Sequence, residues 1–267
     1  MNDAIQTHNQ PAAALWTLGG TAYDDVSFQV SDAISHAVHR MWPRAGEKIL
    51  DVATGTGWTA RTSARWGAHV TGVDIAADLL AAAEELSGHI RPGIEFQLAD
   101  AEKLPFEEAT FDGVISTFGV MFADNHNNAA AELARVCKPG GRLVLATWDP
   151  AGSIAEFFGV AAKHSGAPPP PMSPMLWGKT EHVTDLLSDS FDLKFEKAAS
   201  RLHYPDAEAV WDAFTAGFGP VRALAGRLEG DARKAFKDDF IAFHNKSRTE
   251  AGLDMMREYL LTMGTRK

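Results

Sequence analysis

Cysteine is almost absent from this 267-residue sequence, in which Cys137 is the single example. One cysteine cannot form an internal disulfide, and it cannot build a metal site that needs several thiolates. Acids and histidines also do not gather at the spacings of a metal site. We therefore expect no metal ion to take part in the function.

Positive charge is scarce as well, with 25 Lys+Arg against 35 Asp+Glu and a net charge of −10. Phosphate backbones and anionic membrane surfaces both select for clustered positive charge. No apolar run approaches the roughly 20 residues of a membrane span, and residues 1–11 lack the features of a signal peptide. We expect a cytoplasmic protein that acts on a small molecule and binds neither nucleic acid nor membrane. The oligomeric state stays open.

Short apolar runs alternate with helical stretches through the first half of the sequence. This alternation is typical of a doubly wound α/β fold, in which helices cover both faces of a parallel sheet. Ligands of such sheets bind at the carboxyl ends of the strands. The expected strands are residues 48–53, 69–74, 94–99, 111–116 and 142–148.

The second half of the sequence has a different composition and pattern. It contains a proline-rich segment at 167–174 and aromatic residues at helical spacing. Residues 191–198 and 257–263 predict two further strands. We expect three parts: an N-terminal helical segment over the cofactor site (1–45), a Rossmann-like cofactor-binding core (46–150), and substrate-cap helices with the last two strands (151–267).

The segment from Ile49 to Gly57 predicts a strand, a glycine loop and a helix start. Glycines at 55 and 57 let the backbone approach a ligand closely, and the helix start offers free N–H groups to an anion. The pattern Gly55-x-Gly57-x-x-Ala60 also fits a dinucleotide fingerprint. The loop alone therefore leaves the cofactor open.

Acidic side chains mark three successive expected strands: Asp51 within the first, Asp74 at the end of the second and Asp100 after the third. Each one alone fits a helix cap or a solvated loop equally well. Together in one crevice, the three acids favour a ligand that has an ammonium group, a ribose and an adenine. Asp51 would contact the ammonium group, Asp74 the ribose hydroxyls and Asp100 the adenine amino group.

The sequence resembles class I S-adenosylmethionine-dependent methyltransferases, in the small-molecule group that includes ubiquinone and menaquinone biosynthesis enzymes. The resemblance implies S-adenosyl-L-methionine as cofactor and a seven-stranded sheet whose last strand is antiparallel. It rests on motifs in the family's order between residues 45 and 150, namely residues 50–57, 72–74, 100–106, 111–112, 118–122 and 132–143.

The resemblance also implies roles for individual residues. Ala53-Thr54 stands where Gly-Cys is commoner in the family, and Tyr23 lies where such enzymes close over the cofactor. The implied cofactor-binding residues are Asp51, Ala53, Thr54, Gly55 and Gly57 for the methionine part, Asp74 and Ile75 for the ribose and adenine, Asp100 and Ala101 for the adenine edge, Thr117 and Phe118 beside the methyl group, and Tyr23.

Candidates for catalysis and substrate binding are fewer. His126 follows the fourth strand and is the candidate general base, although a histidine at a helix start is an alternative interpretation. Trp148 and Trp177 are the candidate substrate-binding residues, and they favour an apolar or aromatic metabolite. The acceptor atom stays open.

Two other functions fit parts of the pattern. An NAD(P)-dependent oxidoreductase would use the glycine loop and Asp74, but it leaves Asp51 without a role. A non-catalytic cofactor-binding protein is the second alternative, because a fold does not determine a function.

Overall fold

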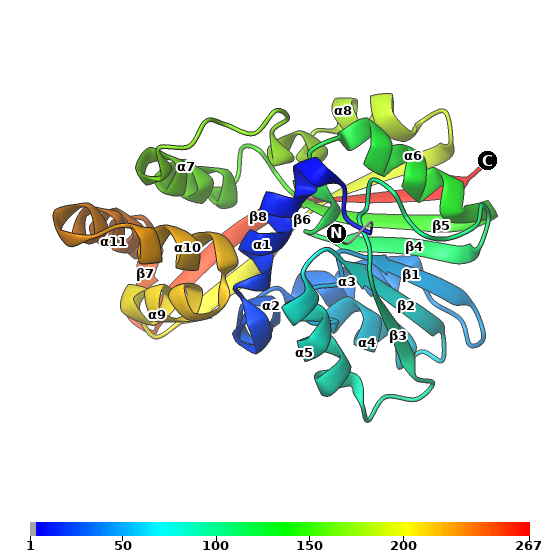
Figure 1. Cartoon of the computed structure of the whole chain (residues 1–267), viewed down its shortest axis with the longest axis horizontal. Coiled ribbons are helices and arrows are strands. Elements are labelled where there is room, and N and C mark those ends of the chain that lie inside the picture. The colour runs from blue at the N-terminus through cyan, green and yellow to red at the C-terminus, as the bar shows by residue number, and fades with distance from the viewer. Residues whose placement is uncertain (1–3) are drawn as a thin grey trace.

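A twisted sheet of eight strands runs through the computed structural model, which describes residues 4–267 (Figure 1). The strand order is β3-β2-β1-β4-β5-β8-β6, and β7 pairs with β8 beside this path. The strands are β1 (Lys48–Val52), β2 (His69–Asp74), β3 (Ile94–Leu98), β4 (Phe111–Thr117), β5 (Cys137–Trp148), β6 (Phe191–Tyr204), β7 (Arg248–Thr249) and β8 (Gly252–Arg266).

The predicted doubly wound fold with an antiparallel last strand is confirmed. Strands β1 to β5 pair in parallel, whereas β8 is antiparallel to both β5 and β6. The central strands β1 and β4 are mostly buried, because helices cover both faces of the sheet. The two-residue strand β7 adds a short hairpin to the seven strands that the sequence predicts.

Helices cover the sheet on two sides. On one face α3, α4 and α5 contact the strands, and on the other α6 packs on β4 and β5 while α8 packs on α6 and β6. No helix in residues 4–267 has the length and apolar character needed to cross a bilayer. The helices are α1 (Gln10–Thr17), α2 (Tyr23–Phe28), α3 (Ser31–Met41), α4 (Trp58–Ala64), α5 (Ala77–Ser87), α6 (His126–Val136), α7 (Ser153–Ser165), α8 (Thr180–Leu187), α9 (Ala207–Gly217), α10 (Gly219–Arg227) and α11 (Gly230–Asn245).

Helices α7, α9, α10 and α11 gather at one end of the molecule and form a cap (Figure 1). The long strands β6 and β8 stay paired from Phe191 to Tyr204, so they reach from the sheet into the cap. Phe236 and Phe240 are fully buried there among other aromatic rings. The cap therefore has an apolar core of its own, joined to the sheet by two continuous strands.

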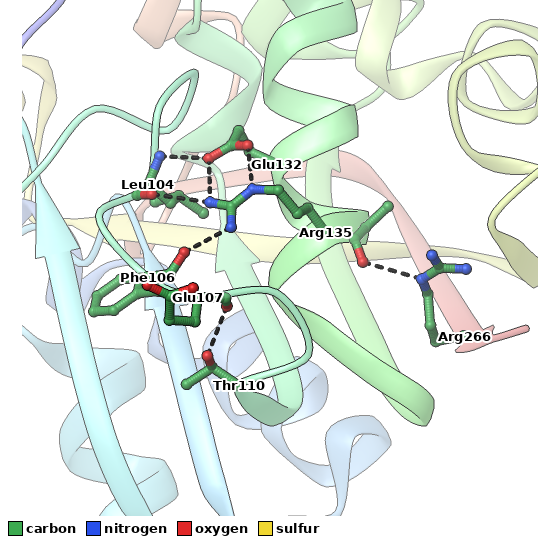
Figure 2. Close-up of polar contacts among 8 residues, drawn as sticks. Leu104, Phe106, Glu107, Thr110, Glu132, Arg135 and Arg266 are labelled. Atoms are coloured by element: carbon green, nitrogen blue, oxygen red, sulfur yellow. Dashed lines mark hydrogen bonds and ion pairs between the residues drawn. The ribbon is translucent and has the colours of Figure 1, made fainter.

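Arg135 of α6 forms hydrogen bonds with the loop that follows β3 (Figure 2). Its guanidinium donates to the carbonyl oxygens of Phe106 at 2.6 Å and Leu104 at 2.9 Å, and to Glu132 at 2.6 Å. Glu132 in turn accepts the N–H of Leu104 at 2.6 Å. Two of the sequence motifs, residues 100–106 and 132–143, are thus joined by one charged network that holds the loop bearing Asp100.

Replacing Phe240 with alanine should cost about 3–5 kcal/mol of unfolding free energy, because it leaves a cavity among buried aromatic rings. Urea unfolding followed by circular dichroism measures this loss. Phe28→Ala is the matched control, since the Phe28 side chain is 56% exposed. Equal destabilisation by the two changes would contradict the assignment of Phe240 to a packed core.

Candidate active site

A single cavity opens where the carboxyl ends of the parallel strands meet the cap and the first two helices. All but two of the residues predicted to bind the cofactor line it, and the exceptions are Asp51 and Gly57. The cap and α1 contribute aromatic rings to the same space. The cavity thus joins the predicted cofactor residues to an apolar pocket. Its aromatic lining consists of Trp16, Tyr23, Trp58, Phe118, Phe122, Trp148, Phe157, Phe158, Phe214 and Phe218.

The loop after β1 turns sharply through backbone conformations with positive φ. Ala53 has φ 57° and Gly55 also has φ 57°. An alanine in this region is strained, which explains in physical terms why a glycine is commoner there in the family. The ring of Tyr23 lies against Gly55, where an added Cβ would approach it to 3.2 Å. Gly55 thus lines the cavity with the ring of Tyr23 packed against it.

Asp74 ends β2 and links the two neighbouring loops. Its Oδ2 accepts the N–H of Gly55 at 2.8 Å, and its Oδ1 accepts the N–H of Ala76 at 2.9 Å. Burial raises the pKa of this carboxyl, while the backbone hydrogen bonds favour its ionised form. Each oxygen keeps a further lone pair, so the carboxylate can also accept two hydroxyl groups of a ligand.

Asp51 lies behind the cavity wall and contacts it through Thr54, whose Oγ1 donates to Asp51 Oδ2 at 2.6 Å. Its other oxygen, Oδ1, is buried and has no hydrogen-bond partner among residues 4–267. Burial raises the pKa of Asp51 to about 7. An orphaned carboxylate oxygen is costly, and an ammonium group would satisfy it.

Asp100 is enclosed by the N-terminal segment. Its Oδ2 accepts the N–H of Gln6 at 3.0 Å and the Nδ2 of Asn9 at 2.9 Å. The neighbouring Glu102 pairs with His8 at 2.7 Å. Gln6 and His8, which precede α1, therefore cover the loop after β3, in which Asp100 and Ala101 were predicted from sequence.

Thr117, the last residue of β4, and Phe118, which follows it, line the cavity. The ring of Phe118 stacks on Trp148, with centroids 3.8 Å apart and planes 14° apart. The hydroxyl of Thr117 lies 2.7 Å from that of Thr59. Trp148, one of the two predicted substrate-binding residues, therefore lines the pocket next to the expected methyl position.

His126 does not lie where the sequence-based hypothesis of a general base requires. It is fully buried at the start of α6, outside the cavity lining, and its Nδ1 bonds to His182 Nε2 at 2.9 Å. Burial lowers its pKa to about 4. A base must reach the substrate, so we correct this prediction: the histidine packs a helix start.

Trp177 is also misplaced by the sequence-based prediction. It is fully buried against His126, with ring centroids 5.5 Å apart, and is absent from the cavity lining. Its carbonyl oxygen accepts the hydroxyl of Thr147 at 2.7 Å, which fixes this segment beneath β5. Trp177 is therefore a core residue of the sheet.

Several lining residues escaped the sequence analysis. Trp16 comes from α1 and Arg257 from β8, and both reach the cavity through tertiary packing alone. No residue of α1 is fully buried, so its sequence does not indicate which of its side chains face the cavity. Arg257 lies in a strand whose alternation is ordinary, so no local pattern distinguishes it.

An α/β sheet of this order, with its ligand-binding crevice at the strand ends, is the fold of class I methyltransferases. Residues 50–145 match the methyltransferase domain family. The resemblance that the sequence predicts is therefore confirmed over these residues.

Curated relatives match parts of this chain. An uncharacterized protein of Mycobacterium tuberculosis, Rv1405c, is 34% identical over 179 residues, covering 66% of this chain and 65% of its own length. A demethylmenaquinone methyltransferase of Clavibacter sepedonicus is 42% identical over 104 residues, covering 39% of this chain and 42% of its own length. The chain thus spans less than two thirds of the curated relatives it matches.

Solved structures share the fold. A putative methyltransferase (BH2331) of Bacillus halodurans superposes with a TM-score of 0.61 at 19% identity, covering 88% of this chain and 98% of that one. A phosphoethanolamine N-methyltransferase of Haemonchus contortus, solved with S-adenosylhomocysteine, has a TM-score of 0.57 at 17% identity, covering 88% of this chain and 52% of that one.

His126 should make stability depend on pH. The pKa of the His126 imidazole is lower in the folded protein than in the unfolded chain. As the pH falls from 6.5 toward 4, the unfolded state therefore binds a proton that the folded state does not bind, and the free energy of unfolding decreases. We expect His126→Gln to remove about 1.5 kcal/mol of the loss between pH 6.5 and 5. Urea unfolding at both pH values tests this, and an unchanged loss would contradict the buried, neutral imidazole.

Proposed function

We propose that this protein transfers a methyl group from S-adenosyl-L-methionine to a small acceptor with an apolar or aromatic body. One observation carries the proposal: the predicted cofactor residues and an aromatic pocket line the same cavity. The aromatic walls favour an apolar acceptor, because burying such surface contributes roughly 25 cal/mol per Å². The methyltransferase domain supports the reaction class.

The residues of the site fit this cofactor. The unpartnered Oδ1 of Asp51 is suited to an α-ammonium group, and the spare lone pairs of Asp74 are suited to two ribose hydroxyls. Gly55 lines the cavity with its backbone, next to the ring of Tyr23. When bound, the cofactor supplies an electrophilic methyl group on a sulfonium centre.

The role of the protein in this proposal is alignment and exclusion of water. Phe118 and Trp148 form a flat apolar wall beside the acceptor, and Tyr23 closes the cavity over Gly55. Orientation of this kind can contribute about 7–11 kcal/mol in the best intramolecular cases. Within residues 4–267 no histidine lines the cavity, which favours an acceptor that needs no histidine base.

S-adenosylmethionine should bind the purified protein, and Asp74→Ala should weaken binding at least tenfold, because two charge-assisted hydrogen bonds are lost. Titration calorimetry measures both affinities, with NAD as the competing ligand. Asp112→Ala is the matched control, since Asp112 pairs with Lys138 near the start of β4. No binding, or a preference for NAD, would overturn the proposed function in favour of an oxidoreductase.

Binding of S-adenosylhomocysteine should weaken about tenfold from pH 8 to pH 6. The pKa of Asp51 is about 7 in the protein alone, and an ammonium group favours its ionised form, so binding must release a proton at lower pH. Asp51→Asn should bind more weakly and with a flatter pH profile. A wild-type affinity that is constant over this range would exclude the proposed contact.

A further inference from the structure

Arg257 is a buried cation in the wall of the cavity. It belongs to β8, its side chain is nearly inaccessible at 4% exposure, and it lines the same space as the aromatic residues. Neither the cofactor residues nor the proposed methyl transfer uses it. A charge in such surroundings is costly unless something compensates for it.

The hydrogen bonds of Arg257 leave part of its guanidinium free. Both bonds come from Nη2, which donates to the carbonyl oxygen of Gln29 and to Ser200 Oγ, the latter at 2.9 Å. Its Nε is buried and has no partner among residues 4–267. The hydroxyl of Ser200 donates in turn to Asp32 Oδ1 at 2.7 Å. Asp32 is therefore linked to Arg257 through the Ser200 hydroxyl group.

The guanidinium is placed toward the substrate side of the pocket. It lies over the ring of Trp148, 5.8 Å from the centroid. Phe118 stacks on the same indole, with ring centroids 3.8 Å apart. Trp148 therefore lies next to both the cation and the residue expected beside the methyl group.

We propose that Arg257 binds a carboxylate of the methyl acceptor, so that the substrate is an aromatic or apolar organic acid. This inference rests on the proposed function. A carboxylate matches a guanidinium in charge and planarity, and it would satisfy the free Nε. A phosphate dianion requires more donors than this otherwise apolar wall provides. The rest of the acid would lie on Trp148 and reach toward Phe118.

The other titratable groups around Arg257 leave it charged. Burial lowers its pKa to about 10, still far above neutral, and Asp32 and Tyr204 favour the charged form. His244 is nearby, but burial lowers the pKa of His244 to about 4, so it is neutral at pH 7. Arg257 is therefore the one charged basic side chain among the described residues that line the cavity, at some distance in the sequence from the lining acids Asp74 and Asp100.

A purely structural role is the competing explanation, because Arg257 ties the end of α2 to β6. The two roles differ in what they predict for ligands. A structural arginine affects stability alone, whereas a binding arginine discriminates an acid from its neutral amide.

The test compares cinnamate with cinnamamide, and 2-naphthoate with 2-naphthamide, by calorimetry on the full chain saturated with S-adenosylhomocysteine. The acids should bind the wild-type protein at least tenfold more tightly than the amides. Arg257→Met should abolish this preference and leave S-adenosylhomocysteine affinity within about twofold. Arg257→Lys, which keeps the charge without the planar fork, should retain part of it. Arg248→Met, a change at an exposed position of β7, should alter neither.

Three results would overturn the inference. The wild-type protein could bind acids and amides equally, or it could bind neither acid at millimolar concentration. The preference for acids could also persist at wild-type strength in the folded Arg257→Met or Arg257→Lys protein. Should Arg257→Met not fold, Arg257→Lys carries the comparison. Failure of S-adenosylhomocysteine to bind at all would instead overturn the proposed function, so the two failures are distinguishable.

Discussion

The carboxylate of Asp74 joins the ends of two strands, and the geometry of the cavity depends on it. It accepts one N–H from the loop after β1 and one from the loop after β2, at 2.8 and 2.9 Å. The strands themselves are held in register, with Val52 beside Val73. Because both loops are fixed to one group, hydrogen bonds of the protein itself hold the positive-φ backbone at Ala53 and Gly55.

The site is closed by parts of the chain that are far from it in sequence. The segment before α1 bonds to Asp100, the ring of Tyr23 lies on Gly55, and the cap adds aromatic rings opposite the strand ends. A parallel sheet supplies polar groups at its strand ends but no apolar enclosure. The helices added before and after the sheet supply that enclosure, and with it a low-dielectric setting in which a single charge such as Arg257 has a large effect.

Much of the fold could be predicted from the sequence because parallel strands are continuous apolar runs. The expected strand at 69–74 has the observed bounds, and those at 48–53 and 94–99 differ by one residue. The strand-end acids were predictable for the same reason. His126 and Trp177 were misjudged because sequence position fixes neither depth nor direction: both lie under β5, facing away from the cavity. Arg257 was missed because its neighbours come from distant segments.

The position of β8 has a consequence for how the protein is made. This strand, Gly252–Arg266, lies between β5 and β6, although both of them precede it in the chain. Until residue 266 has left the ribosome, β5 presents an open edge and β6 has no partner. Exposed edges invite pairing with other chains, so the nascent polypeptide passes through a stage at which protection by a chaperone is valuable. A stop codon or frameshift late in the coding sequence would thus separate β6 from the rest of the sheet, although residues 50–145, which match the methyltransferase domain family, would already be synthesised in full.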